Sequence, residues 1–385
     1  MASFEINADM ITEILSHSHV SVIEKSRLLN KEFNERTHSS SFLKLKLQNT
    51  NSVSGYFLEY NRCLKAHSTI IRNQENIPHK SEISLDFLPR GRVNVKACDA
   101  SHRILLCVND LPFRGRQPEY MICKPTTKQY MIIPKPKTRY FTIALGLVVT
   151  GADPLRYKII RLSHLPSKEN RRYNFNFTLL CEVFDSDSFA WKRLSKNVEL
   201  PAEDIPGVRM SEPVAAYGFL HWLTANNNVL RFCLKTETWS FLTVPENLAS
   251  DRSLKLTRYK GKLGFFRSRS KEGEDYQEIW VLESSLGNSW VKVKKIKSMG
   301  LEPIGFLSND VVTLAGKDKK FLYNYNMNNG KSRKLQIRSP GFSPNMDASL
   351  SYFHLCSDFK RVEFGGRSNG YQQDKSLRFE YEIKK

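Results

Sequence analysis

Residues 278–290 read EIWVLESSLGNSW, and residues 181–191 read CEVFDSDSFAW. Each stretch is an apolar strand pattern followed by a polar turn and then a tryptophan. The same layout recurs at 230–239 (LRFCLKTETW) and at 120–130 (YMICKPTTKQY), and a fainter copy lies at 321–330. Such self-similarity indicates that one supersecondary unit is used several times along the chain.

The spacing of these units predicts a propeller. The aromatic residues that close the turns fall at positions 130, 191, 239 and 290, so the gaps are 61, 48 and 51 residues. A period of roughly 50 residues is typical of kelch-type repeats, each of which forms one four-stranded blade. Blades bury their faces against their neighbours and close into a ring. We predict an all-β propeller over residues 51–385 with six blades, with seven as the alternative and a pair of β-sandwiches as the competing architecture. The blades are expected at 94–134, 141–195, 212–245, 254–295 and 302–338, and the two chain ends of the domain complete the sixth.

The first fifty residues have a helical pattern instead. Ile11, Ile14 and Leu15 share one face of a predicted helix. Asn7 can cap this helix, and Asp9 lies in its first turn, where the helix dipole favours an acid. The sequence therefore predicts a first helix that begins directly after Asn7.

Two further helices and one strand are predicted in the same segment. Residues 21–24 fit a capping box that would start a second helix, and a third would cover residues 30–36. Residues 42–47 alternate apolar and polar side chains like a strand. The chain is thus predicted to be an α+β multidomain protein with a three-helix module at 1–50. Fifty residues bury too little surface to be very stable alone, so the module either caps the β domain or offers an apolar face to a partner.

The β-rich part resembles the F-box-associated region of plant F-box proteins. The resemblance covers about residues 94–360 and depends on phrases that occur in the family's order. In that family the C-terminal domain is thought to recruit the protein to be ubiquitinated. The phrases are RILLC at 103–107, CKPTTKQY at 123–130, YKIIRL at 157–162, YGFLHWL at 217–223, EIWVL at 278–282 and WVKV at 290–293.

Residues 4–47 resemble the F-box, whose three helices dock onto a Skp-type adaptor of a cullin ubiquitin ligase. The match depends on Ile6, Asp9, Arg27 and the segment 41–45, together with the residues that the resemblance assigns to Skp binding. It implies a substrate-receptor subunit that positions a target protein and makes no bond itself. The residues assigned to Skp binding are Ile11, Ile14, Leu15, Val20, Leu29, Lys31 and Phe33.

Three positions depart from the F-box pattern. Asn7 and Ser18–His19 stand where the family usually has proline, and Phe33 stands where it usually has tryptophan. Proline fixes the entry angle of a helix, so its absence predicts looser helix ends and weaker Skp docking.

The charge is large and unevenly placed. The chain has 59 basic and 39 acidic residues, a net charge of +20, and residues 1–50 hold 6 of each, which leaves 53 against 33 for residues 51–385. A basic surface favours acidic partners. The alternative function is therefore a basic propeller adaptor that binds nucleic acid or an acidic protein without a role in ubiquitin ligation.

Other sequence features bound the location and the chemistry. The seven cysteines lie at scattered positions, mostly in apolar runs, which predicts buried free thiols in a reducing compartment such as the cytoplasm or nucleus. We find no run of eighteen apolar residues and no secretory signal pattern at the start, so no membrane association is expected. We find no nucleophile elbow, zinc-ligand spacing, calcium loop or P-loop, and we expect no enzymatic activity, metal or cofactor.

Overall fold

A computed structural model describes the chain in segments. The described residues are 7–18, 20–50, 53–62, 65–72, 83–89, 93–99, 102–109, 118–152, 154–165, 177–200, 210, 212–249, 251, 253–284, 287–316, 321–337, 350–357 and 361–364. Ile6 and His19 lie outside them.

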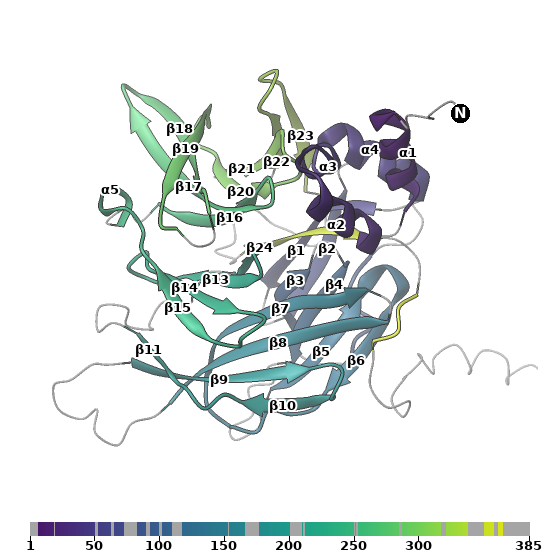
Figure 1. Ribbon diagram of the computed structural model, residues 1–385, viewed down its shortest axis with the longest axis vertical. Coiled ribbons are helices and arrows are strands. Elements are labelled where there is room, and N and C mark those ends of the chain that lie inside the picture. Colours follow the sequence, from purple (N-terminus) through teal and green to yellow (C-terminus); the bar gives the residue numbers. More distant parts are fainter. Residues whose placement is uncertain are drawn as a thin grey trace, which may run out of the picture.

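Four short helices form the N-terminal module (Figure 1). The first begins as predicted: the Asn7 side chain accepts a hydrogen bond from the backbone N–H of Asp9 at 3.1 Å. The second helix begins at Val20, so Ser21 lies inside the helix and is not its cap, contrary to the capping-box prediction. The helices are α1 (Ala8–His17), α2 (Val20–Leu29), α3 (Lys31–Thr37) and α4 (Ser40–Thr50).

The strand predicted at 42–47 is wrong, because these residues belong to α4. The hydroxyl of Ser39 accepts a hydrogen bond from the N–H of Phe42 at 3.2 Å and so caps the helix. Phe42 and Lys46 are buried, and Asn49 bonds to α1. These three residues follow the i, i+4, i+7 spacing of one helical face. Leu43 and Leu45 are half-buried on other faces of α4, so apolar and polar residues alternate along the sequence although the segment is helical.

After the helical module, the strands in the described part of the chain form six antiparallel sheets. Two of these sheets are formed by residues 93–200. One comprises β3 (Val93–Asp99), β4 (Ile104–Asn109), β5 (Glu119–Lys124) and β6 (Gln129–Ile133), with the short helix η1 (Pro125–Thr127) between the last two. The next comprises β7 (Thr142–Ala152), β8 (Leu155–His164), β9 (Phe177–Asp185), β10 (Ala190–Arg193) and β11 (Val198–Leu200).

Three four-stranded sheets follow in chain order. They are β12 (Val214–Ala216), β13 (Phe219–Leu223), β14 (Val229–Cys233) and β15 (Trp239–Leu242); β16 (Lys255–Tyr259), β17 (Lys262–Lys271), β18 (Glu274–Leu282) and β19 (Trp290–Lys297); and β20 (Glu302–Phe306), β21 (Val311–Ala315), β22 (Phe321–Asn326) and β23 (Ser332–Gln336). A helical turn, α5 (Glu246–Ala249), links the first two of these sheets.

The last sheet joins the two ends of the β domain. It has three strands in the order β2 (Lys65–Arg72), β1 (Val53–Arg62) and β24 (Leu350–Ser357), and Val53 pairs with Ser357. The described residues therefore form five blades of four or five strands, not six or seven. The predicted sixth position has this three-stranded sheet instead of a full blade, because the chain ends supply only three described strands to it.

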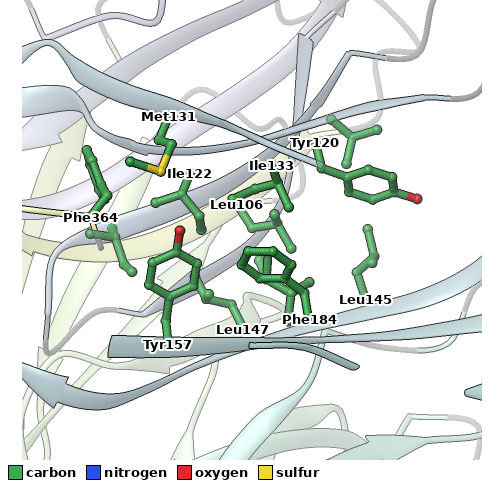
Figure 2. Packing of buried hydrophobic residues seen from close by; sticks show 14 of the residues in the cluster. Leu106, Tyr120, Ile122, Met131, Ile133, Leu145, Leu147, Tyr157, Phe184 and Phe364 are labelled. Carbon is green, nitrogen blue, oxygen red and sulfur yellow. The ribbon is translucent and has the colours of Figure 1, made fainter. Parts of the chain in front are cut away.

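The blades pack face to face around a centre. Each hydrophobic cluster combines side chains from one sheet and the next, which is how a propeller buries both faces of every blade. Figure 2 shows one such layer, in which Leu106 and Tyr120 from one blade face Tyr157 and Phe184 from the next. Phe364, which follows β24 in the chain, is fully buried in the same layer.

Two of the three tryptophans that revealed the repeat, Trp191 and Trp290, have matching roles. The Nε1–H of Trp191 donates to the carbonyl of Pro134, which follows the outer strand of the preceding blade, at 2.6 Å. The Nε1–H of Trp290 donates to the carbonyl of Thr243 in the equivalent place at 3.1 Å. The indoles are buried, as expected for blade cores. The repeated tryptophan therefore fastens each of these two blades to the one before it.

One blade contains a buried ion pair that has no signature in the sequence. Arg161 on β8 and Glu182 on β9 contact each other through Nη1 and Oε2, and their side chains are 2% and 0% exposed. The Arg161 Nε–H also donates to the hydroxyl of Thr142 at 2.9 Å, and Glu182 accepts from the N–H and the hydroxyl of Thr138. Every charge in this cluster is therefore paired and hydrogen-bonded, which is the condition for burying one.

Candidate functional site

The helical module has a small interior of its own. Leu15 on α1, Ile23 on α2 and Phe42 on α4 are buried together, and Ile11 packs against them. A core of this size contributes little stability, since burying one such side chain is worth roughly 1.5–3 kcal/mol. The module therefore depends on additional contacts between its helices and with the propeller.

Polar contacts link the helices of the module. The Nε–H of Arg27 donates to the hydroxyl of Thr37 at 2.9 Å, joining α2 to α3. The ammonium of Lys46 donates to the carbonyl of Ser18 at 2.7 Å, joining α4 to the end of α1. These bonds are partly buried, so each contributes more than an exposed ion pair would.

The residues assigned to Skp binding are divided between the interior and the surface. Ile14 is 59% exposed and Leu29 is 84% exposed. Lys31 is exposed as well, whereas Ile11 and Phe33 are half-buried. Leu15 is buried in the module core and offers no surface to a partner in this conformation. The side chain of Val20 lies outside the described residues.

Three exposed apolar residues on the same two helices were not assigned from the sequence. They are Met10 on α1 and Val22 and Leu28 on α2, and Leu28 is 87% exposed. We call Met10, Ile14, Val22, Leu28 and Leu29 the exposed apolar set.

The module is attached to one end of the propeller. The N–H of Asn309, in the turn between β20 and β21, donates to the carbonyl of His38 at 2.8 Å, and its side-chain amide donates to the carbonyl of Glu35 at 3.2 Å. Burial lowers the pKa of His38 to about 4, with a further contribution from Arg27. The module therefore caps the β domain, and the exposed apolar set nevertheless remains in solvent.

A central cavity of about 660 Å³ lies between the module and the propeller. Its wall includes residues of α2 to α4 and of strands around the ring, among them β3, β12, β16, β20 and β24. Figure 1 shows the helices over this end of the sheets. The wall combines apolar side chains, such as Phe42 and Leu256, with charged ones, such as Lys255 and Arg258.

The surroundings shift the pKa values of ionisable groups in the cavity wall. Glu212 and Lys255 line the wall, where each keeps contact with solvent in the cavity but is enclosed by protein. Burial raises the pKa of Glu212 to about 7, and the nearby Lys255 partly opposes this rise. Burial lowers the pKa of Lys255, and Glu212 and Glu302 oppose this fall. Burial also lowers the pKa of His354 to about 4, so its imidazole is neutral at pH 7.

The basic strand β19 has partners of its own. The ammonium of Lys292 lies 3.2 Å from a carboxylate oxygen of Glu278, and that of Lys297 lies 2.6 Å from Glu274. Lys295 lies over the ring of Tyr276 at 3.6 Å. These lysines thus have acidic or aromatic neighbours within their own blade, which reduces the field that they offer to a nucleic acid.

The described residues include neither a cluster of metal ligands nor a membrane-spanning helix. No group of three or more His, Cys, Asp or Glu side chains there could hold a metal ion. No helix in the described part of the chain is long and apolar enough to cross a membrane.

A helical module with solvent-exposed apolar residues, attached to a propeller of repeated blades, defines a class of two-part interaction proteins. Residues 63–354 match the family model described as the F-box associated beta propeller domain. The chain therefore belongs to the plant F-box proteins that carry an F-box-associated domain. F-box proteins are generally non-catalytic substrate adaptors, and the family implies a Skp-type partner in general.

Three relatives in Arabidopsis thaliana illustrate the similarity. F-box protein At5g41720 is 42% identical over 181 residues, which cover 46% of this chain and 96% of that protein. F-box protein At5g49610 is 24% identical over 230 residues, which cover 58% of this chain and 61% of that protein. F-box protein DOR is 24% identical over 380 residues, which cover 89% of this chain and 90% of that protein.

Proposed function

We propose that this protein is a substrate-receptor subunit of a Skp–cullin–F-box ubiquitin ligase. The helical module binds a Skp-type adaptor and, through it, a cullin, and the kelch-like propeller binds the target protein. Protein ubiquitination then follows from proximity, because the receptor positions a lysine of its target near a ubiquitin-conjugating enzyme. A reducing location in the cytoplasm or nucleus is part of this proposal.

The exposed apolar set is the observation that supports the proposal. The module already has its interior in Leu15, Ile23 and Phe42, and it is already joined to the propeller through Asn309. Leu28 and Leu29 at the end of α2 have no role in either arrangement. Apolar residues on short helices are the means by which a helical surface docks into a partner.

Replacing Leu28 and Leu29 with aspartate should reduce the affinity for a Skp-type adaptor at least tenfold. Each substitution removes an apolar side chain from the interface and places a charge there. Each should therefore cost about 1–3 kcal/mol of binding free energy. The measurement is a titration of the full chain, wild-type and variant, against a purified adaptor. Because both leucines are exposed, the melting temperature should not change.

The matched control is Phe141→Asp. Phe141 is exposed on the propeller between β6 and β7, so the control places one new charge on an apolar surface residue away from the module. Its affinity for the adaptor should equal that of the wild type. If the leucine variant also binds normally, the module is a cap alone and the receptor role is wrong.

Salt dependence distinguishes the alternative adaptor function. Binding to nucleic acid weakens steeply with salt because counterions are released, whereas apolar helix docking does not. The β19 lysines already have acidic and aromatic neighbours, which favours the ligase role. Tight, salt-sensitive binding of nucleic acid by the full chain, together with no adaptor binding, would favour the alternative.

A further inference from the structure

The central cavity has a marked excess of positive charge. Of the residues that line it, six are Lys or Arg and two are Asp or Glu. The cavity volume of about 660 Å³ is within the range of small-molecule sites, roughly 300–1,000 Å³. The basic residues are Arg27, Lys46, Arg103, Lys255, Arg258 and Lys260, and the acidic residues are Asp99 and Glu212.

One of the two carboxylates is held by hydrogen bonds within the blades. Asp99 accepts hydrogen bonds from the backbone N–H of His102 at 2.9 Å, from its ring at 3.0 Å and from the N–H of Val149 at 3.3 Å. Burial by itself raises the pKa of Asp99, but the bonds from His102 outweigh burial and hold it below its usual value. Asp99 therefore keeps its negative charge, and the wall retains six basic residues against two acidic ones.

Two wall residues retain unused hydrogen-bonding capacity. The hydroxyl of Tyr352 and the Nε2 atom of His354 are buried and make no hydrogen bond within the described protein. Both side chains come from the same face of β24, because they are two residues apart in one strand. A buried polar group without a partner costs about 1–3 kcal/mol, so an occupant that bonds to these atoms would recover that cost.

We propose that this cavity binds a small organic or inorganic polyanion with several phosphate or carboxylate oxygens. Guanidinium and ammonium groups from two directions recognise such oxygens: Arg27 and Lys46 belong to the module, and Lys255 and Arg258 belong to β16. The hydroxyl of Tyr352 donates to the same ligand. The occupant bridges the module and the propeller and stabilises their attachment. This inference goes beyond the receptor role and does not depend on it.

The test uses the full-length protein with pyrophosphate and citrate as probes. We expect saturable binding by calorimetry and a rise in melting temperature that increases with probe concentration, as mass action requires for a ligand of the native state. Sodium chloride at the same ionic strength should produce no saturable effect. Comparing the two probes distinguishes phosphate from carboxylate recognition.

Two variants locate the site. Lys255→Ala combined with Arg258→Ala should weaken binding about tenfold or more, since each removes a charge-assisted hydrogen bond. Arg258 is exposed and Lys255 keeps contact with solvent in the cavity, so the fold should survive the change, including the loss of the bond from Lys255 to the carbonyl of Pro303 at 3.0 Å. Tyr352→Phe should leave the melting temperature of the free protein unchanged or slightly raised, because its hydroxyl has no internal partner, and should weaken binding several-fold.

The matched control removes two charges elsewhere. Lys292→Ala with Lys294→Ala on β19 changes the net charge equally but lies outside the cavity wall. Binding should be retained in this control. If neither probe binds saturably, or if the β19 control loses affinity as much as the cavity variant, the binding is non-specific attraction to a basic protein and the site does not exist.

Discussion

Replacing Arg161 with leucine should lower the free energy of unfolding by about 3–5 kcal/mol. The substitution leaves the carboxylate of Glu182 buried without its cation, and its side chain is 0% exposed. Water cannot solvate that charge in the folded state, whereas it does so in the unfolded chain. Urea unfolding at pH 7, monitored by tryptophan fluorescence, measures the difference.

The same strand provides the control for this prediction. Arg156 on β8 pairs with Asp187 at 3.5 Å, and both side chains are more than half exposed. Arg156→Leu should change the stability by less than about 1 kcal/mol, as exposed pairs do. Adding Glu182→Gln to Arg161→Leu should recover part of the loss, because the uncompensated charge is removed. A loss below about 1 kcal/mol for Arg161→Leu would show that water reaches Glu182.

Acidification should destabilise the protein between about pH 6.5 and pH 4. Burial lowers the pKa values of His38, His221 and His354 to about 4, and at His221 the carbonyl of Val214 opposes the fall while Arg231 adds to it. In this pH window the unfolded chain binds protons at these sites and the folded chain does not, so the free energy of unfolding decreases as the pH falls. His221, which is 1% exposed, should alone contribute about 3 kcal/mol.

Glu212 acts in the opposite direction. Its folded pKa of about 7 lies above the ordinary value of 4.5, so its contribution is complete below pH 4.5 and is lost as the pH rises through 7. The decrease in the free energy of unfolding between pH 7 and pH 4 is therefore smaller than the three histidines alone would produce. Urea unfolding at pH 7, 6, 5 and 4 measures it.

A substitution identifies the histidines as the source of this pH dependence. His221→Gln should make the free energy of unfolding less dependent on pH, and adding His354→Gln should reduce this dependence further. Equal slopes for wild type and both variants would assign the acid sensitivity to carboxylates instead.

Local sequence predicted the blades well because their determinants are local. The strand–turn–tryptophan phrase at 278–290 became β18 and the start of β19, and Trp290 occupies the same inter-blade position as Trp191. Likewise, Asn7 caps α1 because a cap requires only the next few residues. The segment at 42–47 was misread because its burial comes from contacts with α1, which no local pattern contains.

The division between exposed and interior residues of the helical module also required the structure. Ile14 and Leu15 are adjacent and equally apolar, but Leu15 turns toward Ile23 and Phe42 while Ile14 turns to solvent. Helical periodicity defines a broad apolar stripe and does not say which edge of it a neighbouring helix covers.

The amino-acid sequence by itself determined the order of helical module and propeller and the limits of most blades, because these follow from periodicity, turn residues and repeat spacing. The family was indicated by the resemblance of particular phrases, such as YGFLHWL at 217–223. Only the tertiary structure decided the number of complete blades, the buried partner of Arg161 and the charge of the central cavity. Each depends on residues that are distant in the chain and adjacent in space. Val53 meets Ser357, Arg161 meets Glu182, and the cavity wall extends from Ile23 to Cys356.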